Sequence, residues 1–392
     1  MKLQLENRLV ALIQRSAEID GSAISGLTVA EAVLAGGGRV HVVFGADGPI
    51  IDQYKALGCQ TSISPHGQWL QKSAGMLRAA RRLYRDWIAS TRILTILKKI
   101  EPDLIYVNSL VGWAGALASR KLKTPLVWHL RELFADVGGE AYPPSIGGKF
   151  FVRREVKRLS DRVVVVSTAV AEQVLASEIT GTISLIPNCL PDSFTACDSL
   201  ERPQVRQDLG IEQSDFVVGA VGSIRHVKGF DVLVKALALL IGRPSLQLVI
   251  AGAGPRAELA ELATQLGVLD KLRLLGPLQP IRPFYNACDI VCIPSRSESF
   301  GRVAVEAMSC GLPIIATNVG GMRDTIVHQE TGLHIEPDSP EQLGHAIMRL
   351  HGDAALRKSL ATAGRRRFQE LFTQTPIRRK LVETMSEALN QA

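Results

Sequence analysis

A chain of 392 residues is longer than one ordinary hydrophobic core and predicts two domains of about 150 to 200 residues each. Hydrophobic residues make up 46% of it and aromatic residues only 5%, which indicates an α/β protein of buried strands and amphipathic helices. No apolar run reaches the roughly 20 residues that span a bilayer, and the first residues lack the pattern of a signal peptide. We therefore expect a cytoplasmic protein.

In the first half of the chain, short apolar runs alternate with helix-length segments. Strands are predicted at 8–15, 40–45, 103–108, 125–130, 162–167 and 184–188, with a helix from about Gly26 to Ala35. This alternation is typical of right-handed βαβ units and a parallel sheet. A segment near 190–205 has no sustained apolar period, and we expect it to link two domains.

The alternation starts again after the linker. Strands are predicted at 216–223, 246–252, 272–276, 289–294, 313–318 and 332–336. The last part reads as two helices with a break at Pro376. We therefore predict a first domain of residues 1–195 joined by a closing helix at 376–392, and a second domain of residues 196–375. Two such domains are expected to face each other across a cleft, with ligands at the carboxyl ends of the strands.

The six cysteines show neither a CxxC pair nor a histidine at the spacing of a metal site. Cys288 and Cys292 lie in the apolar run "CDIVCIP", and we expect both to be small buried core residues. The sequence thus predicts neither a disulfide framework nor a bound metal.

A basic loop follows the first strand of the second domain, in "VGSIRHVKGFDVLVKAL". Arg225 and Lys228 stand where the strand passes to a helix, and Gly229 relaxes the turn. Two cations beside helix-start amides suit a diphosphate, whose charge must be neutralised. The alternative is two solvated surface charges.

A second such loop, "SRSESFGRVAVEAMSCG", contains Glu298 and Glu306. If a helix starts near Phe300, the amides of Phe300, Gly301 and Arg302 are free to bind an anion. Eight residues of helix separate the glutamates by about 12 Å, which is too far for the acid and base pair of a glycosidase. That distance suits one ligand with a sugar at one end and a ribose at the other. Glu306 could instead be an exposed helix residue, but its neighbours are apolar, and a buried glutamate needs a partner.

These motifs resemble a known family. "PSRSESFGRVAVEAMSCGLPIIATNVGG" resembles the E-x7-E segment of the retaining glycosyltransferases of family 4, which have the GT-B fold of two Rossmann-like domains, and "VGSIRHVKGFDVLVKAL" resembles their K-G segment. "DGSAISGLTVAEAVLAGGGRVHVV" is similar to the opening Gly-rich loop and helix of the family, with Gly21 and Ser22 in the loop. The family's C-terminal helix commonly crosses back to the first domain.

The resemblance implies roles for individual residues. Arg225 and Lys228 would hold the donor diphosphate, Glu298 would contact the sugar and Glu306 the ribose, while Gly21 and Ser22 would close over the phosphates. His129 falls where the family places a histidine near the transferred sugar, so that the catalytic candidates are Glu298, His129, Lys228 and Arg225. A lone histidine in this position is more often a satisfied histidine at the end of a strand than a ligand. The sequence departs from the family at Ser223, where many members have arginine, and at Cys189, where glycine is usual.

The implied activity is transfer of a hexosyl group, with retention, from a UDP- or GDP-sugar to a lipid-linked or surface-polysaccharide hydroxyl. No acidic DxD pair follows a strand in the loops that form the cleft, so we expect no metal and no cofactor; a nucleic-acid partner is not expected either. Two alternatives stay open. One is a nucleotide-sugar epimerase on the same fold, and the other is a non-catalytic protein that binds nucleotide sugars.

The net charge of +7 is unevenly distributed. Residues 72–99 contain eight Lys or Arg and one acid, Asp86, and their pattern predicts an amphipathic helix. Its predicted apolar stripe consists of Leu77, Ala80, Tyr84, Trp87, Thr91 and Leu94, and Arg78, Arg82, Arg85 and Arg92 share another face. Such a helix either lies on anionic lipid at the inner face of the cell membrane or packs on the first domain as an ordinary surface helix.

Overall fold

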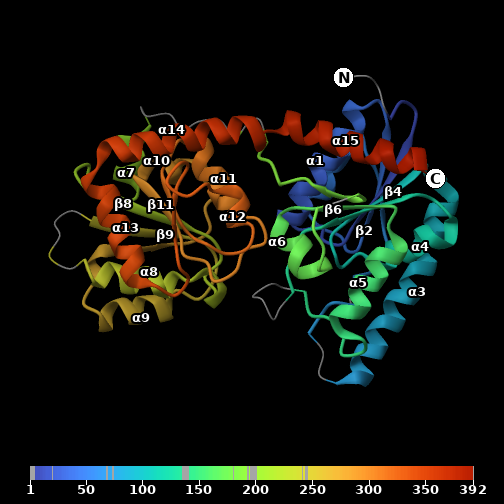
Figure 1. The fold of residues 1–392 in the computed structure, drawn as a ribbon, viewed down its shortest axis with the longest axis horizontal. Helices are drawn as coiled ribbons and strands as arrows, with labels where there is room; N and C mark the ends of the chain where they lie inside the picture. Colours follow the sequence, from blue (N-terminus) through green and yellow to red (C-terminus); the bar gives the residue numbers. More distant parts are fainter. Residues whose placement is uncertain are drawn as a thin grey trace. The chain divides into compact units, whose positions relative to one another are not determined.

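The computed structural model describes residues 5–19, 21–67, 69–72, 75–134, 141–179, 181–191, 194, 201–240, 242 and 246–391. The chain forms two compact units (Figure 1). Unit 1 consists of Met1–Cys189 and Gln374–Ala392, and unit 2 consists of Leu190–Thr373. Half of the predicted linker, residues 192–193 and 195–200, lies outside the described residues.

The described part of unit 1 contains a parallel sheet with the strand order β3-β2-β1-β4-β5-β6-β7. The strands are β1 (Leu9–Gln14), β2 (Arg39–Phe44), β3 (Gln60–Ile63), β4 (Leu104–Asn108), β5 (Leu126–Leu130), β6 (Arg162–Val165) and β7 (Ile183–Leu185). Strands β4 and β5 are buried along their whole length, as expected of a sheet that helices cover on both faces. The short edge strand β3 was not predicted, because "QTSI" is polar and half exposed.

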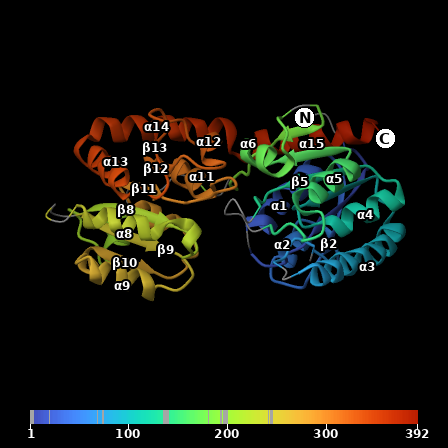
Figure 2. The ribbon, with the colours of Figure 1, turned by 60° about the horizontal axis from the view of Figure 1, so that its bottom comes forward.

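The helices of unit 1 follow the strands in alternation. They are α1 (Gly21–Ala35), α2 (Ile51–Ala56), α3 (Met76–Ile100), α4 (Trp113–Leu122), α5 (Gly148–Leu159), α6 (Thr168–Val170) with the π-helical turn Ala171–Leu175, and α15 (Gln374–Gln391). The C-terminal helix α15 packs beside α1 in both ribbon views (Figure 2). Its residues Ile377, Leu381 and Met385 complete the core of unit 1, so the C-terminal helix returns to the first unit as predicted.

Unit 2 contains a parallel sheet with the order β10-β9-β8-β11-β12-β13. Its strands are β8 (Phe216–Val221), β9 (Leu246–Ala251), β10 (Leu272–Leu275), β11 (Ile290–Ile293), β12 (Ile314–Thr317) and β13 (Leu333–Ile335). Its helices are α7 (Arg202–Asp208), α8 (Phe230–Ala238), α9 (Ala257–Gln265), α10 (Arg282–Ala287), α11 (Arg302–Ser309), α12 (Met322–Thr325), α13 (Pro340–Gly352) and α14 (Ala354–Leu371), with 3₁₀ turns at His226–Lys228 and Leu269–Lys271. Because β8 and β11 are neighbours, the loops that follow them meet at one edge of the sheet.

Two predicted boundaries were wrong. Helix α1 begins at Gly21 rather than Gly26, so Gly21 and Ser22 belong to its first turn and not to a loop. The break near the C-terminus lies at Phe372 and Thr373, not at Pro376. Pro376 sits in the first turn of α15, where a missing amide proton costs little.

The prediction that Cys288 and Cys292 are core residues is confirmed, since both are fully buried. In the described part of the chain, five cysteines are free, and no group of three His, Cys, Asp or Glu side chains could hold a metal ion. No helix among the described residues is long and apolar enough to cross a membrane.

Candidate functional site

The loops after β8 and β11 in unit 2 touch through their backbones. Gly229, between the 3₁₀ turn and α8, has a φ of 66°, and a Cβ atom there would lie 2.0 Å from the carbonyl oxygen of Pro294. Only glycine fits such a contact at positive φ. The turn that carries Lys228 is therefore held against the loop that carries Glu298.

Arg296 fastens these two loops together. Its guanidinium donates to both carboxylate oxygens of Asp231 at 2.8 Å, to Asp338 Oδ1 at 2.7 Å and to the carbonyl of His226 at 2.5 Å. Its backbone N–H donates to the carbonyl of Val227 at 2.8 Å. The fork geometry of arginine allows one side chain to bridge several acceptors at once. Arg296, which was not predicted as a site residue, therefore fixes the position of the turn that carries Lys228.

Lys228 and Glu298 form an ion pair, with Lys228 Nζ 2.6 Å from Glu298 Oε2. Both side chains are only partly exposed, at 20% and 16%. A cation and a carboxylate thus stand together at the meeting point of the β8 and β11 loops. Arg225 is different: it is exposed, and its Nε donates to Ser223 Oγ at 3.0 Å.

The start of α11 has the backbone expected of an anion site. Gly301 has a φ of 96°, and α11 begins after it at Arg302, two residues later than predicted. The free amides of the helix therefore start at Arg302. The side chain of Phe300 is buried, with its ring 6.0 Å from that of Phe372, so that only its backbone can face a ligand.

The geometric prediction for the two glutamates was wrong in one respect. Only Glu306 lies on α11, because the residues from Glu298 to Gly301 precede the helix. The separation of about 12 Å assumed a continuous helix and does not apply. Instead, the Glu298 carbonyl accepts from Gly321 N–H at 2.9 Å, which ties this segment to the loop after β12.

Glu306 is buried and has partners within unit 2. Tyr285 donates its hydroxyl to Glu306 Oε2 at 2.7 Å, and Arg302 Nε donates to Glu306 Oε1 at 2.9 Å. This confirms that the glutamate needs a partner and excludes the alternative of an exposed helix residue. Burial and the neighbouring carboxylate raise the pKa of Tyr285 well above its usual value, so this phenol stays protonated and donating. Each carboxylate oxygen keeps a second lone pair for a ligand.

We expect Tyr285→Phe to lower the free energy of unfolding of unit 2 by about 1–3 kcal/mol, because a buried carboxylate oxygen loses its hydroxyl donor. Hydrogen exchange of unit 2 peptides would measure the loss. Tyr84→Phe is the matched control, since Tyr84 is exposed on α3 in unit 1. Equal exchange in Tyr285→Phe and the unmodified protein would contradict the assigned hydrogen bond.

In unit 1, a buried polar network lies at the carboxyl ends of the central strands. Asn108, at the end of β4, donates to Gln14 Oε1 at 2.6 Å and to the carbonyl of Ser22 at 3.0 Å. Arg131, directly after β5, donates through Nε to Asn108 Oδ1 at 2.8 Å and through Nη1 to Asn188. Gly26 lets α1 approach this network, because a Cβ there would lie 2.9 Å from Gln14 Oε1.

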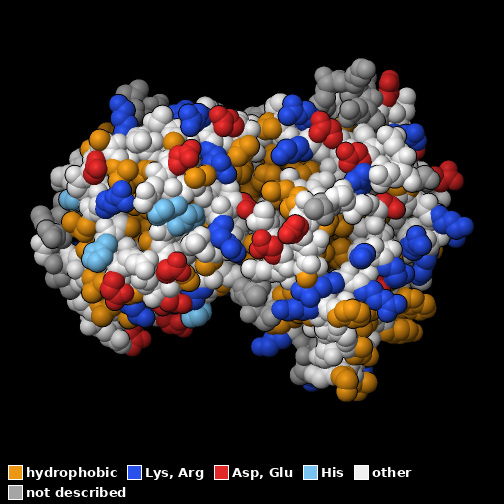
Figure 3. All heavy atoms as spheres, viewed as in Figure 1, with side chains coloured by type: hydrophobic (Ala, Val, Ile, Leu, Met, Phe, Trp, Pro, Cys, Tyr) orange, Lys and Arg blue, Asp and Glu red, His pale blue; other side chains and the backbone are white. Residues whose placement is uncertain are grey.

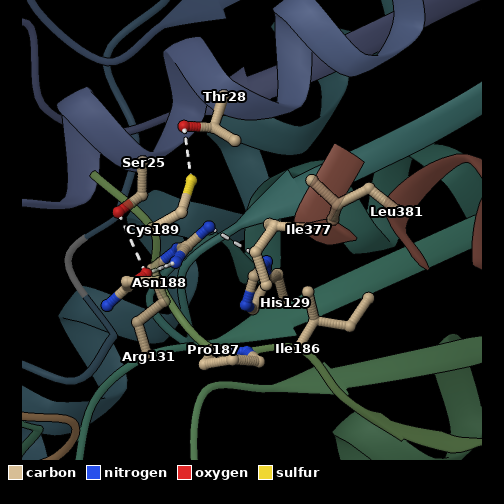
Figure 4. Close-up of a pocket in the computed structure, with 10 residues that line it drawn as sticks. All are labelled: Ser25, Thr28, His129, Arg131, Ile186, Pro187, Asn188, Cys189, Ile377 and Leu381. Atoms are coloured by element: carbon tan, nitrogen blue, oxygen red, sulfur yellow. Dashed lines mark hydrogen bonds between the residues drawn. The ribbon is translucent and has the colours of Figure 1, made fainter. Parts of the chain in front are cut away.

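A small pocket opens beside this network (Figure 4). Helix α1, the end of β5, the segment 186–189 and helix α15 supply its walls. The lining residues are Ser25, Thr28, His129, Arg131, Ile186, Pro187, Asn188, Cys189, Ile377 and Leu381. Ser25 Oγ donates to Asn188 Oδ1 at 3.1 Å, and Thr28 contacts Cys189. Polar groups from the strand ends thus face apolar groups from α15.

His129 lies inside β5, and its side chain is 2% exposed. Its Nδ1 is 2.7 Å from the Tyr106 hydroxyl and 3.0 Å from Arg131 Nη2. Because a guanidinium only donates, Nδ1 accepts and Nε2 carries the proton. Nε2 has no partner among the described residues. Burial first, and the Arg131 charge second, hold the pKa of His129 well below 6.5.

The structure therefore brings together Lys228, Glu298 and the start of α11 in unit 2. In unit 1, Arg131 and Asn108 connect His129 to the carbonyl of Ser22 in the first turn of α1. Three members of the unit 1 network were not predicted from the sequence: Gln14, Asn108 and Arg131. All three end or directly follow a strand of a parallel sheet, where ligands bind. That position was the available signal.

Two family models match this chain. "Glycosyl transferases group 1" matches residues 201–367, and "Glycosyltransferase Family 4" matches residues 19–194. A D-inositol 3-phosphate glycosyltransferase of Xylanimonas cellulosilytica is 30% identical over 316 residues, covering 76% of this chain and 72% of that protein. A protein of the same name from Rhodococcus opacus is 33% identical over 272 residues, covering 65% of this chain and 60% of that protein.

Solved structures share the fold. The crystal structure of Anabaena HepE in complex with UDP and glucose has a TM-score of 0.81 at 23% identity, covering 97% of this chain and all of that one. Sucrose-phosphate synthase from Thermosynechococcus elongatus has a TM-score of 0.75 at 22% identity, covering 98% of this chain and all of that one. The chain therefore belongs to the glycosyltransferases of group 1 and family 4, and its two parallel-sheet domains have the GT-B fold.

Proposed function

We propose that this protein transfers a hexosyl group from a nucleotide diphosphate sugar to a hydroxyl acceptor, with retention at the anomeric carbon. The observation that carries the proposal is the ion pair of Lys228 and Glu298 beside the start of α11. HepE has been crystallised with UDP-glucose, and the curated relatives bear the name of a glycosyltransferase. The HepE complex supports a nucleotide sugar as the donor, and we propose a UDP- or GDP-sugar.

In this proposal Lys228 stabilises the diphosphate leaving group. The bond between the anomeric carbon and the diphosphate oxygen breaks, and negative charge builds up on the diphosphate. A cation and preorganised amides reduce the cost of that charge. Lys228 supplies the cation, the start of α11 supplies the amides, and the exposed Arg225 is a second cation for the same group. We propose that the reaction needs no metal.

Glu298 and Glu306 are proposed to accept hydrogen bonds from the donor. Glu298 is partly exposed and would contact hydroxyls of the sugar. Its pairing with Lys228 supports this role, because the proposed contacts of the two residues lie at the two ends of the glycosidic bond. Glu306 would accept from the ribose through its remaining lone pairs while Tyr285 and Arg302 hold it in place. Gly21, Ser22 and His129 are proposed to act on the same donor from unit 1.

The acceptor is proposed to be a lipid-linked or surface glycan, and the place of action the cytoplasm. One structural neighbour, WaaG, is described as a glycosyltransferase involved in lipopolysaccharide biosynthesis, with a TM-score of 0.69. Its identity of 19% shows the fold alone. The acceptor therefore has to be found by experiment.

The test measures donor consumption with and without an acceptor, with EDTA in a parallel reaction. Glu298→Gln should lower kcat/KM by about ten- to a hundredfold, the cost of weakening a hydrogen bond made to a charged group. Glu261→Gln, on the exposed side of α9, is the matched control and should leave the rate unchanged. NMR of the first product should show the anomeric configuration of the donor.

Other outcomes would identify other functions. Release of free sugar without an acceptor would indicate an epimerase, and binding without turnover would indicate a non-catalytic protein. Full turnover in Glu298→Gln would show that Glu298 has no role in the reaction. A product with the opposite anomeric configuration to the donor would contradict retention.

A further inference from the structure

Two helices of unit 1 carry the positive charge of the whole chain. Helix α3 has seven Lys or Arg and one acid, Asp86, and α5 has five Lys or Arg and one acid, Glu155. Together they hold 12 of the 45 basic residues and 2 of the 38 acidic ones, so the rest of the chain, with 33 and 36, is slightly negative. The basic excess of the protein is therefore local.

Both acids on these helices point inward. Asp86 is buried and accepts from the backbone N–H groups of Gly67 and Trp69, each at 3.0 Å. Glu155 is buried and accepts from Trp113 Nε1 at 3.0 Å and from Arg158. The outer faces of α3 and α5 therefore present cations without carboxylates of their own.

The face of α3 that packs inward is not the predicted apolar stripe. Its buried residues are Ala79, Asp86, Ala89, Ser90, Ile93 and Leu97. At 100° per residue, Leu77 and Tyr84 lie on the opposite face, with Arg81, Arg85 and Arg92 beside them. Leu77 is 68% exposed and Tyr84 60% exposed. These three arginines form no ion pair within the described part of the chain.

Large apolar side chains are exposed where α3 and α5 begin. We call Met76, Leu77, Ile146 and Phe150 the apolar tip; Phe150 is the most exposed, at 74%. The segment before α3 contacts the segment before α5, since Tyr142 N–H donates to the Leu70 carbonyl at 2.9 Å. It also contacts α5 itself, where the Phe151 ring is 6.2 Å from the Trp69 ring. Figure 3 shows apolar side chains at this end of unit 1 bordered by basic ones.

We propose that the apolar tip and the outer faces of α3 and α5 dock on an anionic phospholipid bilayer. Exposed Leu, Ile, Phe and Met side chains can enter the acyl boundary, and Trp87 and Tyr84 suit the headgroup region. Arginines without carboxylate neighbours are attracted to anionic headgroups. This surface adds α5 and the apolar tip to the basic segment 72–99 that the sequence indicated.

Co-sedimentation of the full chain with vesicles at physiological salt tests the proposal. We expect binding to vesicles with 30% phosphatidylglycerol and little binding to pure phosphatidylcholine. Arg81→Glu with Arg85→Glu should weaken binding at least about tenfold, since each basic residue contributes on the order of 1 kcal/mol near such a surface. Arg365→Glu with Arg366→Glu, on exposed positions of α14 in unit 2, is the control and should leave binding unchanged.

Trp87 gives a second readout that does not depend on charge. Of the four tryptophans, Trp69, Trp113 and Trp128 are buried, and Trp87 is 49% exposed. Emission should shift to the blue on adding anionic vesicles, and Trp87→Phe should abolish the shift. Leu77→Ser with Phe150→Ser should also weaken binding, whereas Leu239→Ser, at an exposed leucine of unit 2, should not.

Three results would overturn the proposal: equal binding to neutral and anionic vesicles, binding unaffected by both the charge and the apolar variants, or a dimer in sedimentation velocity that Phe150→Ser dissociates. The last would identify the surface as a self-association interface. The assay contains neither donor nor acceptor, so its failure leaves the proposed glycosyl transfer standing.

Discussion

Replacing Lys228 with alanine should lower kcat/KM for the nucleotide sugar by about 10²- to 10³-fold. The side chain stands in a partly exposed site, 2.6 Å from Glu298, on a turn that Gly229 and Arg296 hold in place. Such a fixed donor acts on charge that develops as the diphosphate leaves, and removing one preorganised donor of this kind typically costs about 3–4 kcal/mol. Steady-state kinetics with saturating acceptor measure the loss.

Lys235→Ala is the matched control for this experiment. Lys235 lies one helix further along, on α8, is half exposed, and has a weak contact of 3.8 Å with Asp231. The kcat/KM of the Lys235→Ala protein should stay within about twofold of that of the unmodified protein, because an exposed ion pair contributes little. A Lys228→Ala protein within threefold of normal kcat/KM would disprove the assigned role.

The double variant Lys228→Ala with Glu298→Gln separates the two residues. If the ion pair acts as one unit, the combined loss will be smaller than the product of the two single losses. If the losses multiply, Lys228 and Glu298 act on different parts of the donor. Either result requires that circular dichroism shows folded protein, because each single variant leaves one charge unpaired.

Unit 1 should lose stability as the pH falls below 6.5, by about 1.4 kcal/mol per pH unit for His129 alone. The pKa of His129 in the fold is held well below 6.5 by burial and by Arg131. Below pH 6.5 the unfolded chain therefore binds a proton that the folded chain does not, and unfolding becomes more favourable. The stability that neutral, buried His129 contributes is fully present above pH 6.5. Burial also lowers the pKa of His66, which acts in the same direction.

Urea unfolding followed by tryptophan fluorescence measures this effect in unit 1 alone, because all four tryptophans lie there. Measurements between pH 7.5 and 5.0 avoid most carboxylate titration. His129→Gln should be less stable at pH 7.5 but should lose stability less steeply as the pH falls. Parallel slopes in the two proteins would contradict the buried, neutral state of His129.

The strands show how much of the fold the sequence predicts. Twelve apolar runs of the kind at 103–108 and 289–294 gave strands close to the expected positions, because a parallel sheet covered on both faces needs continuous apolar residues. β3 was not predicted because its residues are mostly polar. This edge strand is held by backbone hydrogen bonds to β2, which do not depend on side-chain type. At Pro376 the error was the opposite one: a helix break was predicted, but α15 runs through this residue, because a proline is tolerated in the first turn of a helix.

The inward face of α3 illustrates a different limit. Hydrophobic spacing selected Leu77, Tyr84 and Trp87, which are exposed, while Ala89 and Ser90 are buried. Close packing of α3 on α4 favours small residues, and the carboxylate of Asp86 is accepted there because two backbone N–H groups solvate it. Hydrophobicity alone does not reveal such an interface.

The sequence by itself determined the two parallel sheets, the position of the loops after β8 and β11, and the need of Glu306 for a partner, since strand periodicity and burial are local properties. Only the tertiary structure decided that the partners are Tyr285 and Arg302, and that Lys228 pairs with Glu298. It also decided that His129 lies inside β5 with its Nδ1 atom 3.0 Å from Arg131 Nη2. The physical reason is that these contacts join side chains from neighbouring strands and loops, and strand order in the sheet, which brings them together, is not encoded in any single segment.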